Sequence, residues 1–564
     1  MATTPPAVLT RIVAYHADGG ALLQSLARQG VLRTVAAQGP ADRPVDCLLL
    51  ESADITTKAS RTTIAVLEAS TRLTCQGQEV LLEALPGAPA DGLAALARVR
   101  EALPEHIVED SPGCLRLEIP APPEDSGLEE RERLRSVSTI EPLRVLAAAD
   151  VDHPHLPLEA GVVAFDYLAT FESLPEVARG ANTCPDYLFY DARIILVVDH
   201  PTAEATLVGA SADPQALAAR MEELASAIDS AESADSTRSV PPVSGDPGDR
   251  TVRALPTVSD AGFEAVVERM KEHIAAGDVY QVVPSRGFTL PCPDALAAYH
   301  RLRESNPSPY MFYLAAPDFE LFGASPESAL LHSAVSGEVA IRPIAGTRPR
   351  GLSPDGSVDH ERDTRLELEL RTDDKEVAEH VMLVDLARND VARVSVPGSR
   401  RVGDLLRVDR YSRVMHLVSE VSGRLAPDLD ALDAFRASMT MGTLTGAPKL
   451  RAAELIRDVE GVRRGSYGGS VGYFRRDGEL DTCIVIRAAF VHEGTALVQA
   501  GAGVVSDSVP AAEAAETIHK ASAVLEAVAA AQGARLVIGP RPGCENAAGK
   551  DSTGSTHSTD SEVA

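Results

Sequence analysis

Two pairs of glutamates are the residues of this sequence whose spacing is best suited to chemistry. Glu376 and Glu379 lie three residues apart in TDDKEVAEHVMLVDLARND, and Glu513 and Glu516 have the same spacing in PAAEAAETIHK. Both segments carry apolar residues at helical spacing, so each pair is predicted to lie on one helix face, with Lys520 further along the second helix. Like charges at that spacing repel. One such pair is typical of a solvated acidic face, but two helices with such pairs could hold a hard divalent cation such as Mg²⁺.

Three glycine-rich segments follow predicted strands or precede a predicted helix. They are PIAGTRPRG (343–351), TMGTLTGAPKL (440–450) and QAGAGVV (499–505). Glycine lets a backbone approach a ligand closely, and backbone N–H groups at a helix start bind carboxylates or phosphates. Each segment alone is more typical of a plain turn. QAGAGVV lacks the third glycine of a dinucleotide-binding loop. Arg487, at the end of TCIVIR, could bind a substrate carboxylate or form a structural ion pair.

Two further titratable residues stand in distinctive local sequences. His416 lies in RYSRVMHLVSE, and Glu327 follows a Ser-Pro turn in FGASPES. Alone, each favours an ordinary interpretation, a structural histidine and a surface carboxylate. Together with the glutamate pairs they indicate a metal-assisted site for a small polyanion.

Composition limits the partners of this chain. Its 564 residues include 53 Lys and Arg against 82 Asp and Glu, a formal net charge of −29. Such an acidic chain makes nucleic acids and anionic membrane surfaces poor partners. The seven cysteines are scattered and favour reduced thiols in a cytoplasmic protein, and neither a signal peptide nor an apolar stretch of membrane-spanning length is expected.

The elements that must position these residues predict an α+β fold. Strand-like segments dominate the first part, and long helices appear later beside a predicted meander, GGSVGYFRRDGELDTCIVIRAAFVHEGTALVQAGAGVV, with turns at Asp477-Gly478 and Glu493-Gly494. Segments rich in Ser, Asp, Pro and Gly predict a linker and a disordered tail. We expect an N-terminal domain (1–228), a flexible linker (229–250), a catalytic domain (251–535) and a disordered tail (536–564).

Several motifs in the same order carry a family resemblance. PIAGTRPRG, EHVMLVDLARND, VMHLVSEVSG, MGTLTGAPK, RRGSYGGSVGYF, DTCIVIR and QAGAGVVSDS closely resemble the chorismate-binding domain of anthranilate synthase large subunits, densely over residues 256–530. A weaker likeness extends to LLLESADI (48–55) and GVVAFDYLATFESLP. The resemblance implies two intertwined domains of large antiparallel sheets, packed face to face with helices outside. It also implies the conversion of chorismate and ammonia to anthranilate and pyruvate in tryptophan biosynthesis.

The resemblance also implies roles for individual residues. Glu379 and Glu516 would bind Mg²⁺ directly, and Glu376 and Glu513 through water. Glu327 would protonate the departing hydroxyl, and His416 would act in pyruvate loss, with Lys520 adding charge near the metal. Chorismate would be bound by Gly346, Thr347, Tyr467, Arg487, Gly501, Ala502 and Gly503, of which Thr347 is also a catalytic candidate.

The resemblance also implies a tryptophan-inhibitor site, formed by the segments LLLESADI (48–55) and NPSPYMF (306–312). From the pattern alone they indicate only a strand end and a Pro-rich turn. In the family context, feedback inhibition is expected through a pocket formed by Glu51, Ser52, Asn306, Pro309, Tyr310 and Met311.

The residues at two positions, Ala345 and Gln281, distinguish this chain from related enzymes with other activities. Aminodeoxychorismate synthases with a lysine nucleophile carry that lysine where Ala345 stands, and isochorismate synthases carry a water-activating lysine where Gln281 stands. Both residues favour ammonia as nucleophile, although a synthase that stops at the aminated intermediate stays possible. A catalytically silent amino-acid-binding regulator is disfavoured by the complete acid set. No cysteine lies in a G-x-C-x-G glutaminase motif, so we expect a separate glutaminase subunit, commonly in a heterotetramer of two large and two small subunits.

Overall fold

The computed structural model describes residues 6–36, 42–53, 60–121, 127–231, 250–353, 357–410 and 414–539. The expected linker falls almost wholly outside these ranges, as does the expected tail from residue 540 onward. At the edges of the expected linker and the expected tail, the described chain forms regular secondary structure instead. Residues 229–230 belong to a helix that ends at Ser230, and residues 536–538 belong to a strand that ends at Ile538.

The first half of the chain is mainly β-structure, as its aromatic and β-branched segments predict. Its strands are β1 (Ala7–Val13), β2 (Thr34–Val35), β3 (Arg43–Pro44), β4 (Cys47–Ala53), β5 (Ser60–Gln76), β6 (Glu79–Ala84), β7 (Ile107–Ser111), β8 (Cys114–Glu118), β9 (Leu158–Val163), β10 (Tyr187–Asp199) and β11 (Glu204–Ser211). Its helices are α1 (Gly19–Arg28), α2 (Pro89–Ala102), α3 (Glu130–Arg135), α4 (Glu141–Ala147) and α5 (Pro214–Ser230), with the 3₁₀ turns η1 (Pro104–His106) and η2 (Phe165–Thr170).

The second half interleaves strands with longer helices. Its strands are β12 (Thr251–Pro256), β13 (Gln281–Val282), β14 (Ser285–Pro291), β15 (Tyr310–Ala315), β16 (Glu320–Ser325), β17 (Ser328–Ser333), β18 (Glu338–Ile341), β19 (Ile344–Pro349), β20 (Arg401–Arg410), β21 (Val414–Arg424), β22 (Gly446–Ala447), β23 (Ser470–Arg475), β24 (Leu480–Ile484), β25 (Ala488–His492), β26 (Thr495–Gly501) and β27 (Arg535–Ile538). Its helices are α6 (Asp260–Ala276), α7 (Ala295–Ser305), α8 (His360–Thr372), α9 (Asp374–Val394), α10 (Ala431–Ser438), α11 (Gly442–Thr445), α12 (Lys449–Glu460) and α13 (Pro510–Ala531).

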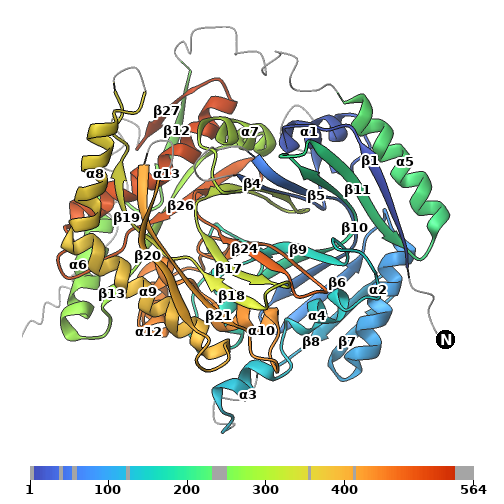
Figure 1. The fold of residues 1–564 in the computed structure, drawn as a ribbon, viewed down its shortest axis with the longest axis horizontal. Helices are drawn as coiled ribbons and strands as arrows, with labels where there is room; N and C mark the ends of the chain where they lie inside the picture. The colour runs from blue at the N-terminus through green and yellow to red at the C-terminus, as the bar shows by residue number, and fades with distance from the viewer. Residues whose placement is uncertain are drawn as a thin grey trace, which may run out of the picture.

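The two halves share one hydrogen-bonded sheet system. Twenty-three of the described strands are connected, and nearly all neighbouring pairs are antiparallel. Strand β9 of the first half lies between β10 and β23, and β4 lies between β5 and β15, so strands of the two halves pair directly at two places. Helices such as α2, α5, α6 and α8 lie on the outside (Figure 1). This arrangement confirms the expected α+β fold with intertwined halves.

The predicted meander is interrupted at Arg487. The two predicted turns are correct, since Gly478 and Gly494 both adopt positive φ between antiparallel strands. However, β24 pairs with β17 and β25 pairs with β16, instead of with each other. Arg487, with a φ of +50°, lies between them. The chain therefore changes its strand partners at this residue, which the local sequence alone did not predict.

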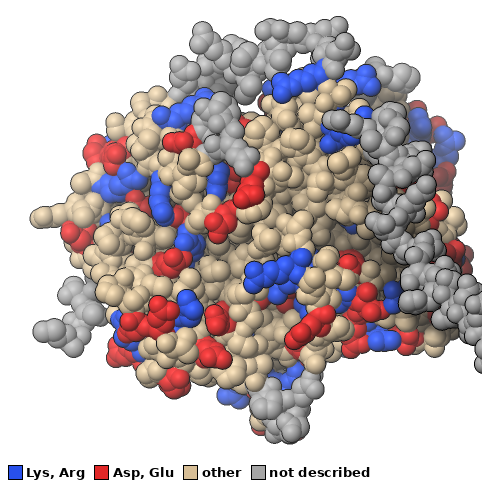
Figure 2. Space-filling model, turned by 180° about the vertical axis from the view of Figure 1, so that it is seen from behind, with Lys and Arg blue, Asp and Glu red and all other residues tan. Residues whose placement is uncertain are grey.

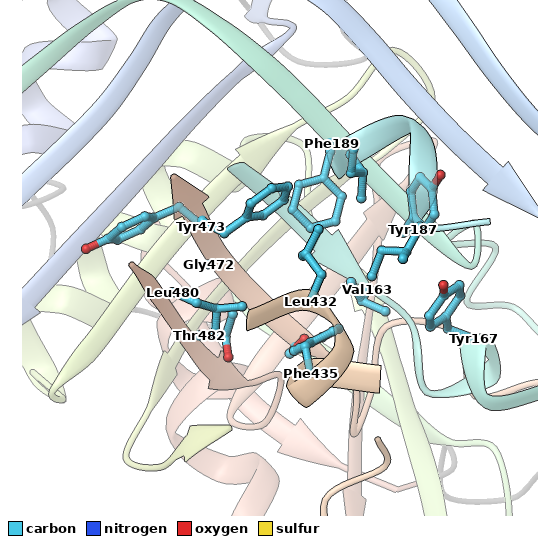
Figure 3. Close-up of a pocket in the computed structure, with 15 residues that line it drawn as sticks. Val163, Tyr167, Tyr187, Phe189, Leu432, Phe435, Gly472, Tyr473, Leu480 and Thr482 are labelled. Atoms are coloured by element: carbon cyan, nitrogen blue, oxygen red, sulfur yellow. The ribbon is translucent and has the colours of Figure 1, made fainter. Parts of the chain in front are cut away.

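A buried polar cluster and an apolar core join the halves. Asp166 of η2 accepts hydrogen bonds from Arg457 Nη2 at 2.7 Å and from the Gly465 amide at 2.8 Å, and all three residues are buried or nearly so. Nearby, aromatic side chains of both halves surround a cavity of about 20 Å³, among them Phe189 of β10 and Tyr473 of β23 (Figure 3). The side chains that line it are mainly apolar and include no carboxylate, histidine, lysine or arginine, so we assign it to the core.

On the face seen from behind, acidic and basic side chains are intermixed around a broad uncharged centre, without a large patch of one sign (Figure 2). None of the helices in the described ranges is long and apolar enough to span a membrane. The six cysteines within those ranges are free.

Candidate active site

Helix α9 carries the first glutamate pair at its N-terminus. Asp373 caps the helix by accepting hydrogen bonds from the Lys375 and Glu376 amides. Arg348 of β19 donates to Glu376 Oε1 at 2.6 Å and to Asp373 at 2.7 Å. Capping and these ion pairs therefore fix the start of α9 against β19.

Glu379 lies one turn further along α9, and Gln281 of β13 donates an amide hydrogen to its Oε1 at 3.0 Å. Burial raises the pKa of Glu379, and the charge of Glu376 raises it further. The charge of Lys520 opposes this shift, whereas that of Glu516 reinforces it. Charged groups on both α9 and α13 shift the pKa of this one carboxylate. The two predicted glutamate pairs therefore lie close enough to interact electrostatically.

Helix α13 carries the second pair. Pro510 occupies its first turn, where a missing N–H is tolerated. Lys520 Nζ lies 2.7 Å from Glu516 Oε1 and donates to the Gly501 carbonyl at 3.0 Å. Burial alone would raise the pKa of Glu516, but the charge and hydrogen bond of Lys520, together with Glu513 and Arg487, lower it. Lys520 therefore links the acidic helix to the glycine-rich end of β26.

The four carboxylates fit a hard divalent cation in their chemistry. Carboxylate oxygens are the ligands that Mg²⁺ takes, in small numbers and with retained water. Within the described ranges no three acidic, histidine or cysteine side chains converge closely enough to hold an ion by themselves. Instead, Arg348 and Lys520 neutralise Glu376 and Glu516. The donor set fits a cation that is completed by water or substrate oxygens.

Two glycines bring backbone next to these carboxylates. Gly346 has a φ of +85°, and a Cβ there would lie 3.2 Å from Glu376 Oε2. A Cβ on Gly503 would lie 2.7 Å from Gln281 Nε2 and 3.4 Å from Glu379 Oε1. Gly346 therefore needs glycine for its backbone conformation, whereas a side chain at position 503 would have to displace the end of Gln281.

Thr347 and His416 meet across neighbouring strands. The register of β19 and β21 places them opposite each other, and the Thr347 hydroxyl lies 2.9 Å from His416 Nδ1. Thr347 is exposed and His416 is half-buried. The hydroxyl can fix the orientation of the imidazole ring.

Glu327 lies between β16 and β17 and is 6% exposed. Burial raises the pKa of Glu327 to about 8, so the carboxyl is protonated at neutral pH. The charge of Lys520 acts weakly on it, which places Glu327 in the neighbourhood of α13. A buried neutral carboxyl group is suited to donate a proton.

Arg487, Tyr467 and the end of β26 form the remaining part of the candidate site. Arg487 donates to the Lys520 carbonyl at 2.8 Å, and no carboxylate of the described chain lies within ion-pair distance of it. Burial lowers the pKa of Arg487. A Cβ on Gly501 would lie 3.1 Å from the Tyr467 hydroxyl. The structural-ion-pair interpretation of Arg487 is therefore not supported among the described residues, and the guanidinium can bind an anion.

The residues of the expected inhibitor pocket are neighbours on two strands. Ser52 and Glu51 of β4 pair with Tyr310 and Met311 of β15, and the Ala53 amide donates to the Pro309 carbonyl at 3.1 Å. Glu51 is 5% exposed and accepts hydrogen bonds from Tyr299 and from Arg303 Nε, the latter at 3.1 Å. Asn306 follows directly at the end of α7. The structure thus brings together residues about 250 positions apart in sequence.

The comparisons with known proteins agree on one family. The sequence pattern of chorismate binding enzymes matches residues 115–526. Anthranilate synthase component 1 of Escherichia coli is 50% identical over 505 residues, covering 88% of this chain and 94% of that protein. The component 1 of Vibrio cholerae is 49% identical over 494 residues, covering 86% and 91%. The chain belongs to the anthranilate synthase component 1 family of chorismate-binding enzymes.

Solved structures support the same fold. Anthranilate synthase component I from Streptococcus pneumoniae superposes with a TM-score of 0.64 at 27% identity, covering 82% of this chain and 92% of that chain. The isochorismate synthase MenF from Escherichia coli gives a TM-score of 0.59 at 18% identity, covering 93% and 95%, a likeness of fold alone. The predicted family, fold class and enzyme class, a chorismate-utilising lyase of the anthranilate synthase type, are confirmed.

Arg348, Lys449 and Asp390 form ion pairs around the candidate site that the sequence did not predict. Arg348 lies inside PIAGTRPRG, directly after Thr347, and nothing in that local sequence indicates its partner Glu376 on α9. Lys449 pairs with Asp390, both within quoted motifs, through two contacts of 2.8 Å. Their spacing of 59 residues offers no periodicity that could reveal a pair.

Proposed function

We propose that this chain converts chorismate and ammonia to anthranilate and pyruvate, as the large subunit of an anthranilate synthase in tryptophan biosynthesis. The observation that supports this most directly is the neutral, buried Glu327 in the neighbourhood of the Lys520 helix, which also carries carboxylates suited to Mg²⁺. A hydroxyl leaves poorly unless it is protonated, and Glu327 would supply that proton to the C4 hydroxyl of chorismate.

Substrate carboxylates would be bound by cationic and backbone donors. Arg487 has no carboxylate partner in the described chain and would bind one of them, with Tyr467 and the backbone of Gly501, Ala502 and Gly503 beside it. Gly346 and Thr347 would contribute from β19. Mg²⁺, held directly by Glu379 and Glu516 and through water by Glu376 and Glu513, would neutralise the ring carboxylate and draw electron density from the ring.

His416 would move the proton in the second step, the loss of pyruvate. The Thr347 hydroxyl lies 2.9 Å from its Nδ1 and would orient the imidazole for proton exchange with substrate. Lys520 lies between Glu516 and the Gly501 carbonyl and would hold the end of β26 in place for binding. Thr347 is therefore a positioning residue for His416 as well as a substrate contact.

Ammonia is the nucleophile that the side chains favour. Ala345 has no amine with which to attack the ring, and Gln281 is engaged with Glu379 and has no proton to titrate. Ammonia would come from a separate glutaminase subunit, in a heterotetramer of two large and two small subunits, or from free ammonium. The component number in the names of the relatives supports a partner component.

Tryptophan would inhibit the enzyme at the β4–β15 contact. The pocket would be formed by Glu51, Ser52, Asn306, Pro309, Tyr310 and Met311, with the N-terminal part (1–228) supplying two of these residues and the catalytic part (251–535) the others. Support comes from the pairing of the two segments in adjacent strands. The inhibitor would have to favour an arrangement of the halves in which the catalytic site is less able to close.

One assay tests the proposal. Purified protein is incubated with chorismate, MgCl₂ and ammonium chloride, and anthranilate fluorescence is followed with and without tryptophan or EDTA. Anthranilate formation that EDTA suppresses is expected, and its suppression by tryptophan supports the inhibitor site. Consumption of chorismate without pyruvate release would indicate a synthase arrested at the aminated intermediate or an isochorismate synthase. No consumption would contradict the enzymatic proposal.

A further inference from the structure

Asn182 of the first half is hydrogen-bonded to two segments of the second half. The residue is 4% exposed and lies in the stretch between η2 and β10. Its Oδ1 accepts hydrogen bonds from the backbone amides of Ser466 at 3.2 Å and Cys184 at 3.3 Å. Its Nδ2 donates to Ser466 Oγ at 3.0 Å and to Gln499 Oε1 at 2.9 Å. The side-chain amide therefore uses both of its donor hydrogens and both acceptor positions, and the two backbone donors determine which side carries the oxygen.

The two partners of Asn182 directly precede residues that are proposed to bind chorismate. Ser466 precedes Tyr467, and Gln499 of β26 lies two residues before Gly501. Alternate residues of a strand face the same side, so Gln499 and Gly501 share one face of β26. A Cβ on Gly501 would lie 3.1 Å from the Tyr467 hydroxyl. Asn182 therefore connects the two segments next to the point where Tyr467 approaches Gly501.

The segment around Tyr467 has a backbone that needs restraint. Gly465 and Gly468, with φ of +63° and +76°, flank Ser466 and Tyr467. Glycine has more conformational freedom to lose on folding than any other residue, so outside contacts must hold such a segment in one conformation. A Cβ on Gly465 would lie 2.2 Å from Asn182 Oδ1. Glycine at position 465 thus gives Asn182 the space to reach the backbone that it restrains.

Two further residues of the first half hold the same segment at Gly465. The Phe165 amide donates to the Gly465 carbonyl at 2.9 Å, and the Gly465 amide donates to Asp166 Oδ2 at 2.8 Å. These bonds fix where the segment begins. Among these three residues of the first half, Asn182 is the one whose side chain also donates to β26. The placement of the Tyr467 segment relative to β26 therefore depends on Asn182.

Tyr467 is suited to donate a hydrogen bond to a substrate carboxylate. Burial raises the pKa of Tyr467 to about 12, so the phenol stays protonated at neutral pH. The backbone at the end of β26 would bind the substrate beside it. Because hydrogen bonds weaken steeply with distance and misalignment, a change in the separation of the two segments would weaken substrate binding. It would do so without removing any group that takes part in the chemistry.

We infer that Asn182 is a positioning residue for chorismate binding, which holds the Tyr467 segment and the end of β26 at the separation that the substrate requires. The inference rests on the proposed function, since it concerns the substrate of that reaction. It gives the first half of the chain a part in substrate binding, in addition to the proposed tryptophan pocket. Asn182 acts through Tyr467 and Gly501 and is not itself a catalytic residue.

Asn182→Ala in the full chain tests this role. The Kd for chorismate, measured by isothermal titration with MgCl₂ and without ammonium, should rise by about fivefold or more, since several hydrogen bonds are lost. In the assay with ammonium chloride, the KM for chorismate should rise likewise, and the KM for ammonium should change by less than about twofold. This split separates a substrate-positioning role from a general loss of structure, which would change both KM values.

Gln499→Met provides a second variant with a milder change. It keeps the length of the side chain and leaves Asn182 in place, but removes the acceptor on β26. It should raise the chorismate Kd in the same direction, and it decides the question if Asn182→Ala does not fold. Because both substitutions break one shared contact, the double variant should bind chorismate no more weakly than Asn182→Ala alone.

Tyr190→Phe is the matched control. It removes another buried hydrogen bond between the halves, from the Tyr190 hydroxyl of β10 to the Ala315 carbonyl of β15 at 2.9 Å. The chorismate Kd should stay within about twofold of the parent value, although thermal stability should fall, since a lost buried hydrogen bond costs stability wherever it lies.

The outcomes separate this inference from the proposed function. The positioning role is wrong if Asn182→Ala folds and leaves the chorismate Kd unchanged, or if Gln499→Met does so when the alanine variant does not fold. It is also wrong if Tyr190→Phe raises the Kd as much as Asn182→Ala, because any loosening of the two halves would then suffice. A parent chain that binds chorismate but forms no anthranilate contradicts the proposed function, whereas the Kd comparison still decides the role of Asn182.

Discussion

The Thr347 hydroxyl and His416 Nδ1 lie 2.9 Å apart, on strands β19 and β21 whose register places the two residues directly opposite each other. A hydrogen bond at Nδ1 determines which tautomer the imidazole adopts and hence the role of Nε2. The pair therefore joins a residue expected to bind substrate to one expected to move a proton.

Thr347→Val removes this hydrogen bond with little change in shape. We expect kcat for anthranilate formation to fall by roughly 10-fold or more, since positioned acid–base groups contribute about 10²–10⁴-fold. Thr347→Ser should restore most of the activity because it keeps the hydroxyl. Thr372→Val, on a threonine that bonds only within α8, is the matched control. Equal activities of the Val and Ser variants would contradict the positioning role.

The raised pKa of Glu327 predicts the pH dependence of the reaction. The acid form is required, so kcat should fall as the pH rises through about 8. Glu327→Gln should be nearly inactive, and its residual rate should lose this transition. The same shift, from 4.5 to about 8, means that this group stabilises the fold fully below pH 4.5 and that the contribution is lost as the pH rises from 4.5 to 8. A pH–rate profile of kcat without an alkaline decrease near 8 would contradict the assignment.

Glu379→Gln tests the proposed metal ligand. The substitution keeps the shape and the Gln281 neighbour but removes a negative charge, so activity should fall by about 10²-fold or more at any Mg²⁺ concentration, as for loss of a main electrostatic element. Asp385→Asn, an exposed acid on the same helix that pairs only with Arg388, is the matched control and should retain activity. Isothermal titration of Mg²⁺ in the presence of chorismate provides a second measurement.

Ser52→Arg should abolish inhibition by tryptophan. Ser52 pairs with Tyr310 in adjacent strands, so a long charged side chain at position 52 would occupy the proposed pocket. Activity without tryptophan should change by less than a factor of about three, since the proposed pocket is separate from helices α9 and α13, which carry the glutamate pairs. Thr10→Arg, at an exposed position of β1, is the control. If Ser52→Arg stays as sensitive to tryptophan as the parent, the inhibitor assignment is wrong.

Asp166→Asn tests how the two halves are held together. Asp166 is 1% exposed and pairs with the buried Arg457, so its loss leaves a buried charge without compensation and should cost about 3–5 kcal/mol of unfolding free energy. Asp458→Asn removes an exposed partner of Arg269 and should cost about 1 kcal/mol or less. Urea denaturation of both variants measures the difference, and equal costs would contradict a specific role of the Asp166 cluster.

Local patterns predicted much of the site because its parts are local. The helix pairs of glutamates, the glycine turns at Gly478 and Gly494, and the strand end at Gly501 each depend on the spacing of a few residues, whereas Gly346, expected after a strand, lies inside β19. The meander was predicted wrongly at Arg487, because the residue changes strand partners through a backbone conformation that neighbouring residues do not reveal. The partners Arg348–Glu376 and Lys449–Asp390 were missed for a similar reason, since they are fixed by packing between distant elements.

The sequence alone determined the residue types of this protein: which carboxylates share a helix face, where glycine permits backbone approach, and to which family the motifs belong. Only the tertiary structure decided which of these groups act on one another. It placed α9 and α13 in one electrostatic environment, paired Ser52 with Tyr310, and buried Glu327 so that its carboxyl is neutral near pH 7. The physical reason is that spacing along a helix or strand is set by local geometry, whereas burial and the approach of distant charges depend on how the whole chain packs.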